Sequence, residues 1–312
     1  MAQYAYFDGR FVPTNEAKIS IMTHAFNYGT GCFEGIRSYW NEEMGQLFVF
    51  RLREHYERLA NSARILQIRL PHSVDELCDI TLELLRRNGV REDMYIRPIA
   101  YKGSEVVGVR LHDLRDDFAI FIAPLGKYLD PEKGSRCGVS AWRRIDDNAI
   151  PSRAKITGSY INSAFAKSEA IANGFDEAIM LTQEGHVAEG SGENIFIVVK
   201  GSLITPAPYE NILIGITRDT AITLAREELS IPVIERSIDR SELYTADECF
   251  MCGTAAEITP VIEIDRRPVG NGQIGPITSR LQKLFFDVVR GRNRRYESWL
   301  SPVYATTGAA RG

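Results

Sequence analysis

One stretch of this chain, between Lys155 and Asn194, collects the side chains best suited to covalent chemistry. Lys155 is flanked by small and apolar residues, Tyr160 follows it five residues later, and Glu189 stands beside a Gly-Ser-Gly turn. A lysine amine can form a Schiff base with an aldehyde, a phenol can bond a phenolic oxygen, and a carboxylate can keep a ring nitrogen protonated. A protein needs these three groups to hold and tune pyridoxal phosphate, so the segment predicts a site for that cofactor.

Each of these residues alone also fits an ordinary structural role. A lone lysine is usually a surface residue, and a glutamate at the end of a strand usually faces solvent. The turn 190–192 is not a dinucleotide-binding fingerprint because a third glycine is missing, and it is not a Walker loop because no Gly-Lys-Ser/Thr follows. We interpret its glycines as allowing the backbone to approach a flat ligand closely.

Two further turns have the composition of phosphate sites. Residues 215–217 precede an expected helix, and the N-terminus of a helix offers free N–H groups and a partial positive charge. Residues 253–256 follow an expected strand and offer the hydroxyl of Thr254 with the amides of small residues. The simpler interpretation makes Thr217 a helix cap and Thr254 a turn residue. A phosphate also needs a cation, for which Arg51 is the candidate.

A third feature, Tyr95-Ile96-Arg97, lies in an expected strand. Side chains alternate between the two faces of a strand, so Tyr95 and Arg97 share one face. A phenol beside a guanidinium is well suited to bind a carboxylate. The alternative is an arginine at the edge of a strand with no ligand.

The elements that must position these residues alternate without a strict strand–helix–strand rhythm, which favours two α+β domains over a doubly wound parallel sheet. We expect a small N-terminal domain at 1–124, a linker at 125–134 and a larger domain at 135–312. In the first domain we expect strands at 4–7, 10–12, 47–50, 94–101 and 118–124, and helices at 53–66 and 74–88. In the second we expect strands at 177–182, 194–200, 203–205, 248–252 and 258–264, and helices at 160–173, 217–229 and 277–289.

The overall composition excludes several classes of partner. The chain has 312 residues, a formal net charge of −4, 44% hydrophobic residues and 25% charged residues, so neither nucleic acid nor a membrane is expected as a partner. No apolar run approaches the ~20 residues of a membrane span, and the first residues lack a signal-peptide pattern, so we expect a cytoplasmic location. Cys249 and Cys252 lie in an expected buried strand without a second pair, so we expect no metal site.

Taken together and in this order, the motifs resemble the class IV, fold-type IV pyridoxal-phosphate aminotransferases, and among them the branched-chain amino-acid aminotransferases. The resemblance extends over nearly the whole chain. The matching segments are 24–37, 50–55, 95–98, 155–160, 189–196, 215–218 and 253–258.

The resemblance implies a role for each residue of the cofactor site. Lys155 forms the Schiff base with pyridoxal 5'-phosphate and moves the proton during catalysis. Tyr160 bonds the phenolic oxygen of the cofactor, and Glu189 pairs with its ring nitrogen. The residues implied to hold the phosphate are Arg51, Ile216, Thr217 and Thr254.

The resemblance also implies a substrate pocket and a partner. The α-carboxylate of the substrate is received by Tyr95 and by the amides of Thr254 and Ala255. The side-chain carboxylate of glutamate is received by Tyr28, Arg97 and Tyr128, and the pocket is lined by Phe33, Gly35 and Tyr160. The loop that carries Gly108 and Val109 reaches into the site of a second subunit, so the protein is at least a homodimer.

The activity implied is transamination of leucine, isoleucine or valine with 2-oxoglutarate, which gives branched-chain 2-oxo acids and L-glutamate. The alternatives of the same fold are a D-amino-acid transaminase, an (R)-amine transaminase and an aminodeoxychorismate lyase. A rival from a different class is a non-catalytic dimeric binding protein on the same scaffold. The pair Tyr95 and Arg97 resembles the branched-chain pattern and argues against the D-amino-acid transaminase and the lyase, while a substrate range that extends to aromatic L-amino acids or (R)-amines stays open. The presence of both Lys155 and Glu189 argues against the binding protein.

Overall fold

The computed structural model describes residues 3–126, 129 and 132–305, and the chain forms two compact units. Unit 1 comprises Met1–Leu125 and Asp287–Gly312, and unit 2 comprises Gly126–Phe286. Each unit contains a β-sheet with its own helices, so the predicted α+β class is confirmed. Positions 127, 128, 130 and 131 of the expected linker lie outside the described residues, and the linker stays a prediction. No helix in the described part of the chain is long and apolar enough to cross a membrane.

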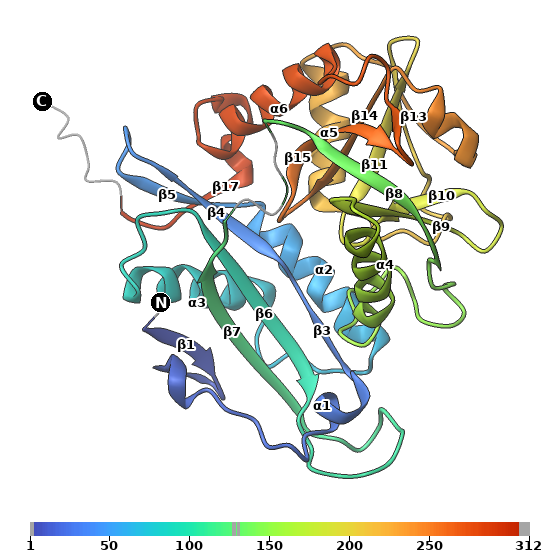
Figure 1. Cartoon of the computed structure of the whole chain (residues 1–312). Helices are drawn as coiled ribbons and strands as arrows, with labels where there is room; N and C mark the ends of the chain where they lie inside the picture. Colours follow the sequence, from blue (N-terminus) through green and yellow to red (C-terminus); the bar gives the residue numbers. More distant parts are fainter. Residues whose placement is uncertain (1–2, 127–128, 130–131, 306–312) are drawn as a thin grey trace, which may run out of the picture. The chain divides into compact units, whose positions relative to one another are not determined.

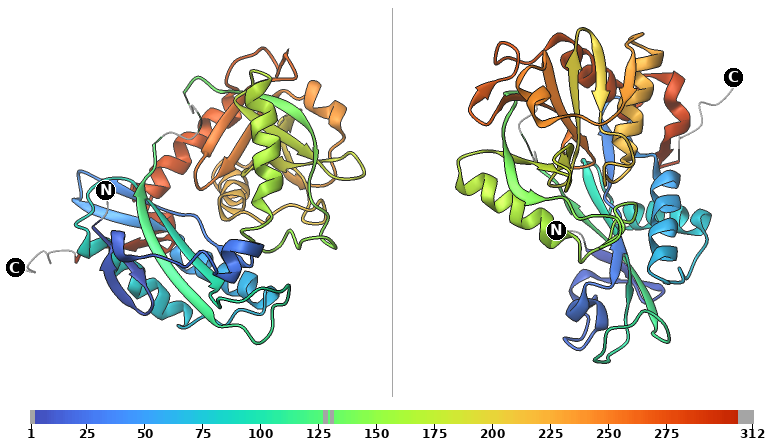
Figure 2. Two further views of the ribbon diagram at one scale, coloured as in Figure 1. Left: turned by 60° about the horizontal axis from the view of Figure 1, so that its bottom comes forward. Right: turned by 90° about the vertical axis from the view of Figure 1, so that its right-hand side faces the viewer.

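Unit 1 is built on an antiparallel sheet with the strand order β17-β5-β4-β6-β7-β1-β2, in which β3 also pairs with β6. Two helices, α2 and α3, pack side by side on one face of this sheet (Figures 1 and 2). The strands are β1 (Tyr4–Phe7), β2 (Arg10–Pro13), β3 (Gly31–Phe33), β4 (Ile36–Asn41), β5 (Gln46–Phe50), β6 (Met94–Lys102), β7 (Asp116–Pro124) and β17 (Leu300–Pro302). The helices are α1 (His24–Tyr28), α2 (Leu52–Ile65) and α3 (Val74–Arg87), with 3-10 turns at Thr14–Glu16 and Arg294–Trp299.

Local sequence explains the limits of α3. The Ser73 hydroxyl accepts from the backbone N–H of Glu76, and the Glu76 carboxylate accepts from the N–H of Ser73, which completes a capping box. At the other end Gly89 has a φ of 58°, a left-handed conformation that glycine adopts without strain. The predicted helix at 74–88 is therefore confirmed to within one residue, and Ser73 is its N-cap.

The end of the chain belongs to unit 1, whereas the sequence placed it in the second domain. Strand β17 pairs antiparallel with β5, and the guanidinium of Arg290 binds the carboxylate of Asp93 through two hydrogen bonds of 2.8 and 2.6 Å. The side-chain amide of Asn41 donates to the carbonyl of Arg290 at 2.6 Å. The predicted domain at 135–312 is wrong at this end, because the partners of the last strand lie far away in sequence and leave no local pattern.

Unit 2 is built on a mixed sheet with the strand order β10-β9-β8-β15-β14-β11-β12-β13, in which β16 also pairs with β15. The neighbours β8–β9, β8–β15 and β12–β13 are parallel. Helix α4 packs along β8 and β9, and α5 packs on β14 (Figure 1). The strands are β8 (Ser135–Arg143), β9 (Glu177–Leu181), β10 (Val187–Gly190), β11 (Asn194–Val199), β12 (Ser202–Thr205), β13 (Val233–Glu235), β14 (Glu248–Gly253), β15 (Glu257–Ile264) and β16 (Arg267–Pro268). The helices are α4 (Tyr160–Ala172), α5 (Ile216–Glu227) and α6 (Pro276–Val289), whose residues from Asp287 onward belong to unit 1, with a 3-10 turn at Arg240–Tyr244.

The core of unit 2 lies on both faces of its sheet and includes the two cysteines of the CxxC motif. Cys249 packs in a cluster with Ile197 and Met251 on one face. Alternation places Cys252 on the opposite face with Phe250, whose ring stacks on Phe196 at a centroid distance of 4.8 Å. Burial raises the pKa of both thiols. Two thiols on opposite faces of one strand cannot bond to each other, so the structural interpretation of this motif is confirmed.

Candidate active site

The lysine and tyrosine of the first motif contact each other in unit 2. Lys155 lies in the turn before α4, and Tyr160 is the first residue of that helix. The turn is closed by hydrogen bonds from the Ser159 hydroxyl to the carbonyl of Ile156 (2.8 Å) and from the N–H of Tyr160 to the carbonyl of Thr157 (3.2 Å). As a result the Lys155 amine lies 5.4 Å from the centroid of the Tyr160 ring.

Glu189 is buried in unit 2, with only 6% of its surface exposed. The alternative interpretation, in which this glutamate faces solvent at the end of a strand, is therefore wrong. Its Oε1 lies 2.8 Å from Nε of Arg144. Its Oε2 accepts from the side-chain amide of Asn194 (3.2 Å) and from the backbone N–H of Leu213 (3.1 Å). A buried carboxylate needs a cation and hydrogen-bond donors of this kind, because water no longer solvates it.

The turn after Glu189 folds over a second buried carboxyl group that was not among the predicted site residues. The N–H of Gly192 donates to Glu193 Oε2 at 3.1 Å, and a Cβ at Gly190 would come within 2.6 Å of the same oxygen. The first glycine thus makes room for Glu193. Burial, followed by the nearby carboxylate of Glu177, raises the pKa of Glu193 to about 8. The sequence signal that could have identified Glu193 was the presence of a second glutamate, in Gly-Glu-Asn, directly after the glycine turn.

Helix α5 begins at Ile216, and its cap is Gly215 in an extended conformation. Thr217 is the second helical residue and is buried, so it is not the helix cap that the simpler interpretation proposed. A Cβ at Gly215 would lie 2.1 Å from Oδ1 of Asn194, and the amide of Asn194 also donates to the carbonyl of Leu213 (2.9 Å). Asn194 therefore connects Glu189 to the segment that leads into the first turn of α5, where the N–H groups lack intrahelical acceptors.

The turn that contains Thr254 and Ala255 lies against the glycine turn after Glu189. A Cβ at Gly253 would be 3.4 Å from the carbonyl oxygen of Gly192. Strand β11, which follows the glycine turn, pairs antiparallel with β14, which precedes the Thr254 turn. Unit 2 therefore brings Glu189 together with both predicted phosphate turns.

In unit 1 the strand β6 presents Tyr95 and Arg97 on one face, as predicted from alternation. Nε and Nη2 of Arg97 donate to the hydroxyl oxygen of Tyr95 at 3.0 and 2.6 Å. The Arg97 guanidinium lies 4.1 Å from the centroid of the Phe33 ring. A Cβ at Gly35 would come within 2.6 Å of the Tyr95 hydroxyl. The structure thus brings together four of the predicted pocket residues, and only glycine fits at position 35 in this arrangement.

Another part of unit 1 joins Tyr28 to the loop that carries Val109. The N–H of Gly108 donates to the Tyr28 hydroxyl oxygen at 3.1 Å. His24, which is fully buried, lies 2.8 Å through Nε2 from the carbonyl oxygen of Gly108. The side chain of Val109 is 87% exposed. Tyr128, the remaining predicted pocket residue, lies outside the described residues.

Arg51 is the residue before α2 and has a left-handed φ of 48°. Its Nε donates to Glu54 at 2.8 Å, and its guanidinium lies 4.9 Å from the centroid of a Trp299 ring. Two turns further along α2, Arg58 donates from Nε and Nη2 to the two carboxylate oxygens of the fully buried Glu34, both at 2.7 Å. Arg58 was not among the residues predicted from the sequence.

The Glu34 carboxylate remains anionic although it is buried. Burial by itself would raise the pKa of Glu34, but Arg58 and His55 outweigh burial and hold that pKa well below its usual range. His55 contributes through Nδ1, which lies 2.8 Å from Glu34 Oε2. Because His55 and Arg58 are three residues apart on one helix face, the helical pattern was the signal that could have found this pair.

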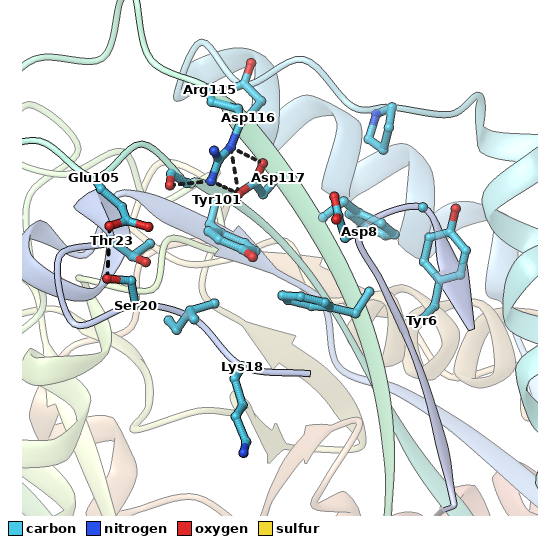
Figure 3. A pocket seen from close by; sticks show the side chains of 16 residues that line it. Tyr6, Asp8, Lys18, Ser20, Thr23, Tyr101, Glu105, Arg115, Asp116 and Asp117 are labelled. Atoms are coloured by element: carbon cyan, nitrogen blue, oxygen red, sulfur yellow. Dashed lines mark hydrogen bonds and ion pairs between the residues drawn. The ribbon is translucent and has the colours of Figure 1, made fainter. Parts of the chain in front are cut away.

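Figure 3 shows a separate pocket of unit 1, with a volume of about 390 Å³. It is lined by the β1–β2 turn, residues 18–23 and parts of β6 and β7, and by none of the predicted site residues. Among its lining groups, Arg115 binds the carboxylate of Asp117, and the hydroxyl of Ser20 donates to Glu105. Nor do three His, Cys, Asp or Glu side chains gather as a metal site in the described part of the chain.

The fold and these residue clusters define a class of enzyme. The model of the amino-transferase class IV family matches residues 31–264, and the chain belongs to that family. Among curated proteins, the probable branched-chain-amino-acid aminotransferase of Aquifex aeolicus is 57% identical over 301 residues, which cover 96% of this chain and 97% of the relative.

Solved structures resemble this chain over the same length. The branched-chain aminotransferase of Thermoproteus uzoniensis with norvaline has a TM-score of 0.93 and 49% identity, and the match covers 97% of this chain and 100% of that one. The branched-chain amino acid aminotransferase of Thermobaculum terrenum in its PLP form has a TM-score of 0.93 and 41% identity, with 97% and 99% covered.

Proposed function

We propose that this protein is a pyridoxal 5'-phosphate-dependent aminotransferase that transfers the amino group of leucine, isoleucine or valine to 2-oxoglutarate. The products are the branched-chain 2-oxo acids and L-glutamate. The observation that carries the proposal is the arrangement in unit 2, where the Lys155 amine lies beside Tyr160 and Glu189 is held as a buried carboxylate between Arg144 and Asn194. Family membership and the names of the relatives support the same activity.

Pyridoxal phosphate fits the donor set of unit 2. When bound, it supplies an aldehyde that accepts an amine and a ring that withdraws electrons from the substrate. Lys155 is the amine, Tyr160 is the partner for the phenolic oxygen, and Glu189 is the partner for the ring nitrogen. Ile216 and Thr217 offer the first turn of α5 to the phosphate, and Thr254 offers its hydroxyl.

The residues of the chain then have distinct tasks. The amine of Lys155 accepts and returns the proton that leaves the substrate, a form of general acid–base catalysis that contributes about 10²–10⁴-fold. Tyr160 orients this amine through its ring, and its hydroxyl would donate a hydrogen bond to the phenolic oxygen of the cofactor. Glu189 stays anionic and fixed, so that it stabilises positive charge in front of it without rearranging.

We assign substrate recognition to the cluster in unit 1 and to the Thr254 turn. Phe33 and Gly35 form an apolar wall that suits a branched side chain, while the Arg97 guanidinium can bind the distal carboxylate of glutamate. Tyr28 and Tyr128 assist Arg97. The side-chain hydroxyl of Tyr95 and the amides of Thr254 and Ala255 receive the α-carboxylate.

Arg51 remains our candidate cation for the phosphate, but the structure adds a competitor on the same helix. Arg51 already binds Glu54 and lies over Trp299. Arg58 also binds a carboxylate, that of the buried Glu34, through two hydrogen bonds that fix the direction of its guanidinium. Both arginines thus already bind an acid, and Arg58 is the alternative because a fixed guanidinium loses less entropy on binding a dianion.

We further propose a homodimer in the cytoplasm. Residues 19–26 and the loop 104–109 are joined by hydrogen bonds, such as that from the N–H of His24 to the carbonyl of Ser104 (2.9 Å). Together they expose an apolar face that suits a second copy of this chain better than water. The five free cysteines support a reducing compartment. The exposed apolar residues of this face are Ile19, Ile21, Met22, Phe26, Val106, Val107 and Val109.

The experiment that tests the activity is a set of half-reactions on the protein loaded with cofactor. The absorbance of the bound cofactor is followed after separate addition of L-leucine, L-glutamate, D-alanine and an (R)-amine. We expect rapid spectral conversion with L-leucine and L-glutamate only. Conversion by D-alanine or the (R)-amine alone would reject the proposed substrate class while leaving the cofactor assignment intact.

A further inference from the structure

Arg144 is a charged residue in contact with Glu189 to which the proposed mechanism gives no task. It follows β8, and its backbone is fixed there, because its N–H donates to the carbonyl of Leu181 at 2.8 Å and its carbonyl accepts from the side-chain amide of Gln183 at 3.2 Å. Its side chain is 12% exposed. The Nε group lies 2.8 Å from Glu189 Oε1 and only weakly reaches the carbonyl of Asn211, at 3.3 Å.

The other oxygen of Glu189 is held independently. Asn194 and the N–H of Leu213 both donate to Oε2, while Arg144 holds Oε1. Donors on both oxygens prevent the carboxylate from rotating about its last bond. Asn194 also contacts Gly215, the cap of α5, so the carboxylate is fixed relative to the helix end proposed for the phosphate.

We propose that Arg144 is a positioning residue that acts through Glu189: it fixes the orientation of this carboxylate and compensates its charge, so that Glu189 would remain an anionic partner for the ring nitrogen of bound pyridoxal phosphate. This inference rests on the proposed function of Glu189. Without the guanidinium, Glu189 keeps the neutral donors of Asn194 and Leu213, and a buried carboxylate that loses its cation takes up a proton more readily. The effect of Arg144 on the cofactor would therefore pass through Glu189.

The test uses the holoenzyme and a double-mutant cycle. The variants are Arg144→Gln, Arg144→Lys, Glu189→Gln and the double variant R144Q/E189Q, with Arg143→Gln as the matched control because Arg143 is the exposed neighbour at the end of β8. Three quantities are measured for each protein: the dissociation constant of pyridoxal phosphate, the position of the visible absorption band, and the single-turnover rate with L-leucine. The first two do not depend on turnover.

We expect R144Q to lower the single-turnover rate about 10- to 100-fold, the range for losing a hydrogen bond to a charged group, and to shift the absorption band. In the E189Q background the same replacement should change the rate less than about twofold, because the group through which Arg144 acts is already altered. R144K keeps the charge and should lose only about two- to threefold. R143Q should match the unchanged protein.

Additive losses in the double variant would overturn the inference, as would an R144Q protein with an unchanged band and rate. If R144Q does not fold, the cycle is run with R144K, whose smaller loss must also vanish in the E189Q background. A normal rate for E189Q alone would reject the proposed role of Glu189 and the inference with it. If E189Q has a low single-turnover rate and the loss caused by R144Q simply adds to it in the double variant, the inference about Arg144 is overturned while the role of Glu189 stands.

Discussion

Replacing Glu193 by glutamine should remove a pH-dependent loss of stability. Glu193 and Glu177 are both buried carboxyl groups, and the amine of Lys167 approaches Glu177 at 2.5 Å. Burial and then the charge of Glu177 raise the pKa of Glu193 from 4.5 to about 8, with a smaller contribution from Glu189. The folded protein therefore keeps a proton on Glu193 that the unfolded chain releases above pH 4.5.

The sign and size of the effect follow from this difference in bound protons. Where the folded state binds more protons than the unfolded state, the free energy of unfolding falls as the pH rises. The stability contributed by protonated Glu193 is fully present below pH 4.5 and is lost as the pH rises to about 8. At about 1.4 kcal/mol per pKa unit, the loss over this window is on the order of 3–5 kcal/mol, a large share of the ~5–15 kcal/mol of a typical protein.

A glutamine amide at position 193 preserves the acceptor for the N–H of Gly192 and remains neutral, so the E193Q protein should lack this part of the pH dependence. The assay is urea unfolding of the original protein, E193Q and a control, E184Q, at pH 5, 6.5 and 8 and at one protein concentration. Glu184 is exposed on the turn between β9 and β10, so E184Q should follow the original protein. We expect similar midpoints at pH 5 and a higher midpoint for E193Q at pH 8. Midpoints that fall in parallel for E193Q and the original protein would refute the reasoning.

Three further predictions concern the site. Lys155→Ala should abolish the visible absorption band of the bound cofactor, and a band that persists unchanged would remove Lys155 from its role. Arg97→Ala should lower turnover with glutamate at least about tenfold more than with leucine, because a charge-assisted hydrogen bond is worth about 1.5–3 kcal/mol; equal losses in steady-state kinetics would contradict a distal-carboxylate role. Equilibrium dialysis should show that the dissociation constant of pyridoxal phosphate differs between Arg51→Ala and Arg58→Ala. The variant with the larger rise has lost the arginine that binds the phosphate; if the constant rises in neither variant, another residue supplies the cation.

Local sequence patterns were sufficient to predict the structure where a side chain and its partner lie close together in the sequence. The capping box of α3 and the shared face of Tyr95 and Arg97 depend only on helical and strand periodicity, and the structure has both. Strands β4 and β8, by contrast, were not predicted. Strand β8 carries arginine and serine among small residues, and it acquires its place as an interior strand from its parallel neighbours β9 and β15.

The sequence by itself determined which reactive groups the protein has, because the identity of an amine, a phenol, a carboxylate or a guanidinium does not depend on folding. Only the tertiary structure decided which of these groups are buried and which charges compensate them. The carboxylate of Glu189 meets Arg144 from another part of the sheet, burial and then the nearby Glu177 raise the pKa of Glu193, and β17 joins unit 1 through β5. Such contacts join residues far apart in the chain, and burial strengthens electrostatic interactions to an extent that no local pattern encodes.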